Sequence, residues 1–270
     1  MKRKQVIKNT YTSRQIFIKK FMKNKLAVVG SLIIIVFVIM AIFAPIFATF
    51  DPNTTDLLNI RTSPNKVHIL GTDDLGRDIF SRLLYGGRVS IAVGVASMML
   101  QILIGVTIGV IAGYFGGLMD KIIMRIVDII MCFPFFVIAI ALAAVIGGSI
   151  TNLVLIIGML MWPVITRIVR GEVLVTKQNE YILAAKALGF NTFEIIIHHI
   201  IPNIISAILV SSTLCIAQGI LMEATLSFLG LGVNPPTPSW GNMLVAAQNM
   251  SVLSHKWWMW IPAGMSVVLI

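Results

Sequence analysis

Charged residues are scarce in this chain. Only 12% of its 270 residues are Asp, Glu, Lys or Arg, whereas 57% are hydrophobic. A soluble domain carries about a quarter charged residues, so the composition excludes a soluble globular protein. Several uncharged runs reach the roughly 20 residues that a membrane span requires. The sequence therefore predicts an all-α integral membrane protein that crosses the membrane several times.

Motifs for metal, nucleotide or covalent chemistry are missing as well. The two cysteines, Cys132 and Cys215, fall inside apolar runs and indicate packing rather than a disulfide or a metal site. No GxxxxGK[ST] loop is present, so we do not expect this chain to hydrolyse ATP. HExxH and GxSxG are absent too. His198 and His199 are adjacent and point about 100° apart on a helix, so we expect no metal there.

Uncharged runs define about six membrane spans. They are 26–50, 89–119, 129–166, 200–222 and a run that starts at Trp257, and the third is long enough to break into two at Gly147-Gly148-Ser149. The last run has 14 residues up to Ile270, or about 21 Å at 1.5 Å each. That falls short of a core of about 30 Å. We therefore expect a truncated sixth helix and a further C-terminal tail.

Basic residues near the spans predict the orientation. Residues 1–25 contain nine Lys or Arg and no acid, whereas the 51–88 loop balances five acids against five bases. We expect residues 1–25 to be cytoplasmic, 26–50 to be a retained anchor helix, 51–88 to be extracytoplasmic, and 89–270 to form a helical core. With six spans the C-terminus is cytoplasmic too. The net charge of +10 then reflects topology, and nucleic-acid binding is not expected.

A helix–glycine–helix segment interrupts the apolar pattern between Glu180 and Asn203. Gly189 is placed to end the first helix in a left-handed conformation, and Asn191 with Glu194 predicts a capping box that starts the second. Each helix has an apolar stripe at i, i+3, i+4, i+7 spacing. The stripes are Tyr181, Ala184, Ala185 and Leu188, and Phe193, Ile196, Ile197 and Ile200. Such a segment is typical of a surface that docks against a soluble partner.

Charged and glycine-rich positions elsewhere leave alternatives open. Glu223, inside an apolar run, is a candidate for the transport pathway, or else lies near the outer surface and pairs with a backbone amide or a basic group. Asp78 and Arg82, at i, i+4 spacing, are expected to pair on a short helix rather than bind a metal. A third pattern favours helix packing over pore lining. It consists of glycines four residues apart: Gly105, Gly109, Gly113 and Gly117.

The 177–203 segment resembles the EAA loop of permease subunits in bacterial ABC importers. Leu183-Ala184-Ala185 occupies the E-A-A positions, Gly189 the glycine, and Ile201-Pro202 the closing pair. The stretches GTDDLGRDIFSRL and SFLGLGVNPP…WG resemble those of the "C"-type subunits of dipeptide, oligopeptide and nickel permeases. The similarity covers about residues 20–270. Leu183 departs from the pattern, because the family has an acid there; Glu180, on nearly the same helix face, is a candidate substitute.

The resemblance implies a multi-pass subunit in the bacterial cell membrane with a five-helix permease core. Its partners would be a second homologous permease subunit, two cytoplasmic ATP-binding subunits that hydrolyse the ATP, and an extracytoplasmic solute-binding protein. The cargo would be di- or oligopeptides, with nickel or a metal chelate as the alternative. The implied residues for coupling to the ATPase are Glu180, Ala184, Ala185, Gly189 and Pro202. A membrane-embedded enzyme that uses Glu223 and Asp128, or an autonomous channel, are weaker alternatives.

Overall fold

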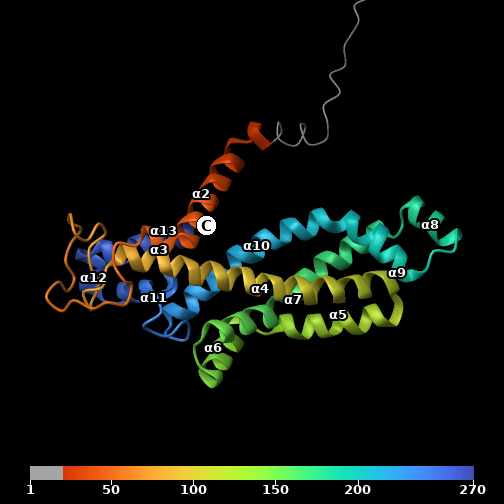
Figure 1. Cartoon of the computed structure of the whole chain (residues 1–270). Helices are drawn as coiled ribbons and strands as arrows, with labels where there is room; N and C mark the ends of the chain where they lie inside the picture. Colours follow the sequence, from red (N-terminus) through yellow and green to blue (C-terminus); the bar gives the residue numbers. More distant parts are fainter. Residues whose placement is uncertain (1–20) are drawn as a thin grey trace, which may run out of the picture.

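The structure, a computed structural model, describes residues 21–270 (Figure 1). Within them the regular elements are helices, apart from an isolated bridge between Thr72 and Asp78. In chain order the elements are α2 (Lys25–Ile42), α3 (Ala44–Phe47), α4 (Ile79–Phe115), α5 (Gly117–Cys132), α6 (Phe135–Ile146), α7 (Ile150–Thr176), α8 (Glu180–Ala187), α9 (Thr192–Ile195), the π-helix η1 (Ile196–Ile200), α10 (Ile201–Phe228), α11 (Trp240–Leu244), the 3-10 helix η2 (Val245–Gln248), α12 (Met250–His255), the 3-10 helix η3 (Trp257–Met259) and α13 (Ile261–Leu269).

Helices α4, α7 and α10 run side by side and form the body of the molecule (Figure 1). The glycine stripe of α4 lets α7 approach closely. A Cβ atom built at Gly105 would lie 2.6 Å from Cβ of Ile165, and one built at Gly109 would lie 2.9 Å from the carbonyl oxygen of Thr166. The expectation of helix packing is therefore confirmed for this part of the stripe. Gly117 is different, because it has a positive φ of 56° and begins α5.

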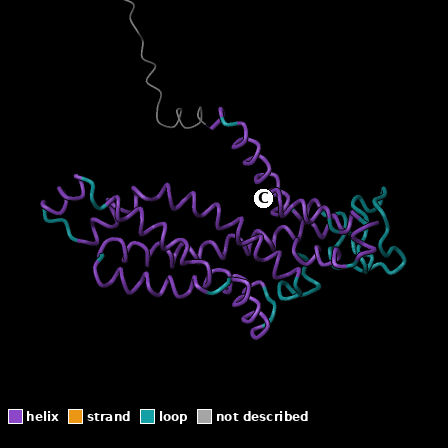
Figure 2. The backbone as a smooth tube through the Cα atoms, turned by 180° about the vertical axis from the view of Figure 1, so that it is seen from behind, coloured by secondary structure: helices purple, strands orange, loops and turns teal. Residues whose placement is uncertain are grey.

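The two ends of the bundle differ in structure (Figure 2). One end, the loop end, contains the long 48–78 connection together with the segments and short helices of residues 229–260. The opposite end, the tip, contains α8, α9 and η1, which together cover residues 180–200. Two candidate functional regions thus lie at opposite ends of helices that are long enough to cross a membrane.

Helix α6 projects from the bundle, and α2 diverges from it (Figure 1). The axes of α5 and α6 differ by 78° at a break next to Pro134, which has no N–H to continue the hydrogen bonds of a helix. Gly147, at a φ of 81°, then ends α6, and Ser149 caps α7 by accepting a hydrogen bond from the Asn152 N–H. The expected break at Gly147-Gly148-Ser149 is confirmed.

Four described helices, α2, α4, α7 and the α9–α10 unit, are long and apolar enough to span a membrane. The bent α5–α6 pair makes five if it counts as one span. The run from Trp257, expected as an incomplete sixth span, forms η3 and the nine-residue α13. Within the first expected span, 26–50, α2 ends at Ile42 and α3 follows after Phe43. The basic segment 1–25 lies mostly outside the described residues.

Candidate functional site

The tip is built by local signals that the sequence displays. Gly189 has a φ of 86°, its N–H donates to the Lys186 carbonyl, and the Phe190 N–H donates to the Ala185 carbonyl, at 3.1 Å each. This is the Schellman pattern of hydrogen bonds that closes a helix at a left-handed glycine. The capping box between Asn191 and Glu194 is also present. The predicted helix–glycine–helix turn is therefore confirmed in detail.

The last element of the tip, the π-helix η1, leads into the long helix α10. It spans Ile196–Ile200, and Pro202 stands in the first turn of α10 that follows. Proline has no N–H to donate to the preceding turn. The side-chain amide of the next residue, Asn203, donates to the His199 carbonyl at 2.6 Å. Pro202 itself is exposed at this junction.

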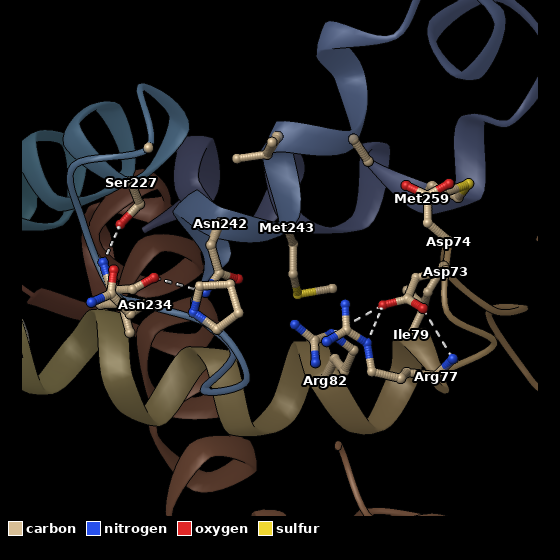
Figure 3. A pocket seen from close by; sticks show the side chains of 15 residues that line it. Asp73, Asp74, Arg77, Ile79, Arg82, Ser227, Asn234, Asn242, Met243 and Met259 are labelled. Atoms are coloured by element: carbon tan, nitrogen blue, oxygen red, sulfur yellow. Dashed lines mark hydrogen bonds and ion pairs between the residues drawn. The ribbon is translucent and has the colours of Figure 1, made fainter. Parts of the chain in front are cut away.

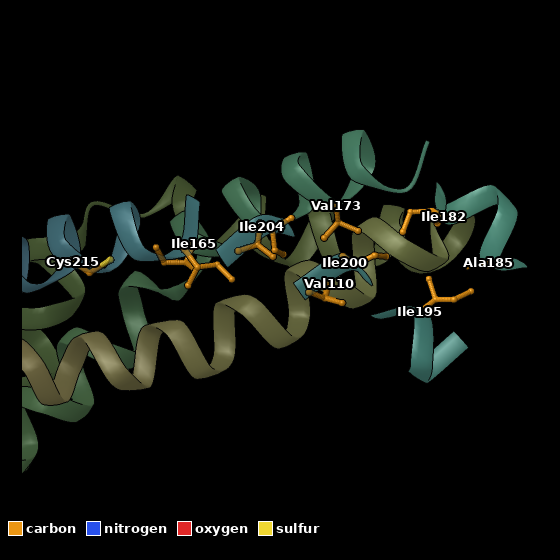
Figure 4. Close-up of a cluster of buried hydrophobic side chains, with 11 residues drawn as sticks. Val110, Ile165, Val173, Ile182, Ala185, Ile195, Ile200, Ile204 and Cys215 are labelled. Carbon is orange, nitrogen blue, oxygen red and sulfur yellow. The ribbon is translucent and has the colours of Figure 1, made fainter. Parts of the chain in front are cut away.

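One face of the tip is anchored in the protein's own core (Figure 4). Ile182 and Ala185 of α8, Ile195 of α9 and Ile200 of η1 are buried in a cluster with Val173 of α7 and residues of α4 and α10. Lys186 adds a cation–π contact, with Nζ 5.2 Å from the centre of the Tyr114 ring. The tip is therefore a rigid extension of α4, α7 and α10.

The other face of the tip exposes large apolar side chains. Leu183, Leu188 and Phe193 are 54%, 78% and 72% exposed. Together with the half-exposed Tyr181 and Phe190 they form a surface that we call the tip patch. Ala184 and Glu180 are exposed next to it. The apolar stripes expected from helical spacing are thus only partly at the surface.

For two residues of the apolar stripes, the expected position at a docking surface is wrong. Ala185 and Ile200 are buried, 5% and 0% exposed, because α7 and α10 cover them. Helical spacing alone groups residues on a face but does not say which neighbour covers that face. Ala185 therefore holds α8 against the bundle instead of facing outward.

Glu223 lies near the loop end of α10 and is fully buried. Its carboxylate accepts hydrogen bonds from the hydroxyl groups of Ser90 and Ser227, at 2.7 Å each. Ser90 also accepts a hydrogen bond from the backbone N–H of Trp240 at 3.1 Å. The hydroxyls replace the backbone amide or basic partner that the sequence suggested. Glu223 thus joins α4, α10 and α11, and a role in the pathway stays a prediction.

The charges at the start of α4 are paired differently from the expectation. Asp78 caps α4 through the Ser81 N–H and contacts Nδ1 of His68 at 3.0 Å. Arg77 and Arg82 instead share Asp73, with Nε 2.7 Å and 3.5 Å from one of its carboxylate oxygens. The predicted Asp78–Arg82 pair is wrong, because Asp78 is the N-cap residue and points back along the loop.

Two ion pairs join α5 to α7 towards the tip half of the bundle. Arg170 makes a two-pronged pair with Asp120, and Arg167 contacts Asp128. The Arg167 and Asp128 side chains are 47% and 51% exposed on the surface of the described chain. Ionisable groups in membrane helices face protein or water in preference to lipid. The α5–α7 face is therefore not an ordinary lipid-facing surface.

Sequence reasoning missed the serines around Glu223 and the arginine pair on Asp73. Ser90 and Glu223 are 133 residues apart, so no local spacing connects them. A usable signal was the presence of Ser90, Ser227 and Ser239 next to apolar runs, since such hydroxyls need buried partners. That signal marks polar positions without saying which ones meet.

Two family models match the sequence. The model of the N-terminal TM domain of oligopeptide transport permease C matches residues 12–64. The model of the binding-protein-dependent transport system inner membrane component matches residues 105–270, which is more than half of the chain. The chain belongs to this family of inner membrane components.

Named relatives agree with the family assignment. The chain is 45% identical over 246 residues to the oligopeptide transport system permease protein OppC of Bacillus subtilis, covering 91% of this chain and 80% of the relative. It is 41% identical over 252 residues to the dipeptide transport system permease protein DppC of Alkalihalophilus pseudofirmus, covering 93% and 82%. It is 42% identical over 241 residues to the glutathione transport system permease protein GsiD of Shigella flexneri, covering 88% and 80%.

This inner membrane component is an all-α, multi-pass protein of a bacterial membrane, as the composition and the resemblance indicated. The expected family, including its "C"-type group, is confirmed. A permease subunit of an ABC importer is not itself the ATPase.

Proposed function

We propose that this permease forms half of the translocation pathway of an ATP-driven importer for di- and oligopeptides. The tip carries the proposal, because it combines a buried, anchored face with an exposed apolar one. The relatives named above are permeases for oligopeptides, dipeptides and glutathione, which supports peptides over the nickel or metal-chelate alternative. ATP is the cofactor of the partner subunits in this proposal and is not bound by this chain.

The tip acts as the coupling element in this proposal. A cytoplasmic ATP-binding subunit holds the tip patch, and closure of the two ATP-binding subunits moves the tip as a lever. Force passes to α4, α7 and α10 because Ile182 and Ile195 are buried among them. Gly189 and Pro202 shape the turn and the junction, whereas Ala184 and Glu180 border the docking surface.

Docking at the tip relies mainly on apolar contact. Leu183, at the acidic position of the EAA pattern, is 54% exposed among other apolar residues. Burying apolar area yields about 25 cal/mol per Å², so a few such side chains can supply several kcal/mol. Glu180, exposed one turn earlier, remains the candidate for a peripheral ion pair.

A second homologous permease subunit faces the α5–α7 surface in this proposal. The Arg167–Asp128 pair is about half exposed among residues 21–270, and the projecting helix α6 packs on α7 while Val137 and Val145 stay exposed. Charged side chains at this depth are stable against another protein or a water-filled path. The pathway therefore lies along the α5–α7 side, between the two permeases.

The loop end is extracytoplasmic in this proposal and meets a solute-binding protein. Its orientation follows from the bases of residues 1–25, which favour a cytoplasmic N-terminus. The tip then lies in the cytoplasm, because α4, α7 and α10 place it at the opposite end (Figure 1). Cargo released by the binding protein meets the 48–78 connection and the 229–260 segments first.

Uptake by the assembled importer tests the proposal. The permease pair, the ATP-binding subunits and the solute-binding protein are reconstituted in liposomes, and uptake of a radiolabelled dipeptide is compared with uptake of ⁶³Ni²⁺. We expect ATP-dependent peptide uptake. Uptake of nickel but not of peptide would favour the nickel or metal-chelate alternative. Peptide flux without ATP or partner subunits would support an autonomous channel.

Substitution of the tip patch tests the coupling role. Changing Leu183 and Phe193 together to Ser removes apolar area without touching the buried anchors. We expect weaker association with the ATP-binding subunits and loss of uptake, while the thermal unfolding midpoint of the permease stays unchanged. The matched control changes Met99 and Leu103, exposed on α4 far from the tip, to Ala. Normal uptake by the tip variant would contradict the coupling role.

A further inference from the structure

A cavity of about 320 Å³ opens at the loop end, on the side opposite to the tip (Figure 3). It lies between the start of α4, the 73–79 turn, and the segments that follow α10. Small-molecule sites have volumes of about 300–1,000 Å³, so this cavity suits a small ligand. Its charged lining comes from Asp73, Asp74, Arg77 and Arg82.

The two arginines that line the cavity share one carboxylate. Arg77 and Arg82 both contact Asp73. Asp74 pairs with Arg61, which lies outside the lining. Two guanidinium groups therefore have one carboxylate between them, and an anionic ligand can pair with the donors that Asp73 leaves unused.

The arginines also have unused hydrogen-bond donors. Arg77 uses Nε on Asp73, and the hydrogen bonds among residues 21–270 leave both of its Nη atoms free. Arg82 uses Nη1 on the Pro52 carbonyl at 3.0 Å, and no hydrogen bond of the described chain uses its Nη2. Both guanidinium groups lie next to the Asp73 carboxylate in Figure 3. Guanidinium donors of this kind match a carboxylate in a planar, two-pronged geometry.

The rest of the cavity is apolar and suits a small side chain. Met243, Val245 and Met259 line it together with Ile79 and Val233. Methionine side chains adapt their shape to different apolar groups. Asn234 is at the rim and donates its amide to the Gly148 carbonyl at 2.6 Å, so its Oδ1 is available to a peptide N–H. The lining thus combines an anion site with a tolerant apolar site.

We propose that this cavity binds the free C-terminal carboxylate and last side chain of a short peptide at the loop end, with Arg77 as the principal anchor. The inference rests on the proposed peptide cargo and adds a reception site on the permease itself. Arg82 supports the site from below, because its buried guanidinium is tied to Pro52 and Asp73. Asp73 bridges the two arginines when no peptide is present.

A binding measurement without the solute-binding protein tests the site. The assembled complex of two permeases and two ATP-binding subunits is held in nanodiscs. Binding of radiolabelled alanyl-phenylalanine is then compared with binding of its C-terminal amide. We expect the free acid to bind at least about tenfold more tightly, as the loss of a charge-assisted hydrogen bond implies. Equal binding of acid and amide, or no binding of the acid, would overturn the proposal.

Three variants assign the effect to the arginine. Arg77→Gln is expected to weaken binding of the acid about tenfold or more and to leave binding of the amide unchanged. Arg77→Lys keeps the charge but loses the planar fork, so intermediate affinity is expected. Lys66→Gln is the matched control, because Lys66 is an exposed cation of the same connection and does not line the cavity. Wild-type affinity in Arg77→Gln would contradict the assignment.

Peptide uptake by the complete importer separates this site from the proposed function. If the wild-type importer takes up peptide while the nanodisc complex does not bind it, the function stands and the site is refuted. If the wild-type importer takes up no peptide at all, the proposed function is refuted, and the site, which rests on it, is refuted with it. An Arg77→Gln variant that weakens only the docking of the solute-binding protein, with peptide affinity unchanged, would also refute the site and favour a protein contact instead.

Discussion

Replacement of Gly189 by Val is expected to weaken the tip's hold on the ATP-binding subunit. Gly189 has a φ of 86° and no neighbouring heavy atom within 4 Å of an added Cβ. The Cβ of a valine there has open space, so the expected cost is that of a β-branched residue in a left-handed backbone. That cost is about 1–2 kcal/mol, which corresponds to a factor of about 5–30 in the population of the native turn.

Asparagine at the same position is the matched control. It also adds a Cβ and a polar group, but Asn adopts left-handed backbone far more readily than Val. Equilibrium binding of the ATP-binding subunits to nanodisc-held permeases measures the difference. We expect Gly189→Val to bind about 5–30-fold more weakly and Gly189→Asn to bind nearly as well as the wild type.

Neither substitution is expected to change the packing of α4, α7 and α10, since the Schellman turn lies at the surface of the tip. The midpoint of thermal unfolding in detergent is therefore expected to be the same for the two variants. Wild-type affinity and wild-type uptake in Gly189→Val would refute the reasoning. So would equal weakening by Val and Asn, because then the conformation of residue 189 would not be the cause.

Three further substitutions probe the packing and the loop end. Gly109→Ala is expected to lower the thermal midpoint, because an added Cβ would lie 2.9 Å from the Thr166 carbonyl oxygen and overpacking costs about 1–3 kcal/mol; Gly30→Ala, in open space, should not. Glu223→Leu is expected to destabilise by about 1–3 kcal/mol for each serine hydroxyl left unpaired, measured by thermal unfolding, whereas Glu223→Gln keeps polar partners and should lose less. Asp78→Ala removes the N-cap of α4 and should cost about 0.5–2 kcal/mol. Limited proteolysis within the 51–78 connection is expected to be faster in this variant.

Local sequence signals were reliable where one residue controls the backbone. The left-handed Gly189, the Asn191–Glu194 capping box and the break at Gly147 all appear as predicted. Each depends on the conformational freedom of glycine or on a side chain that reaches its own backbone three residues away. These interactions stay within a few residues, and hence a pattern in the sequence is enough to find them.

Partners that are distant in sequence were not predictable in the same way. The sequence suggested Arg82 as the partner of Asp78, yet the fold brings His68 to Asp78 and leaves Arg82 to Asp73. An i, i+4 spacing favours a pair only inside a helix, and Asp78 stands just before the helix begins. Loop geometry therefore decided the pairing, and with it the two arginines that share Asp73 beside the cavity.

Membrane residence, the approximate spans and the turn at the tip follow from composition and short-range chemistry, because apolar length and backbone preference are properties of contiguous residues. The covered side of the tip, the serine partners of Glu223 and the cavity at the loop end depend on the packing of α4, α7 and α10. Ala185 illustrates the difference, since its helical position follows from spacing but its burial follows from α7 and α10. Burial is a property of neighbours, and only the tertiary structure supplies them.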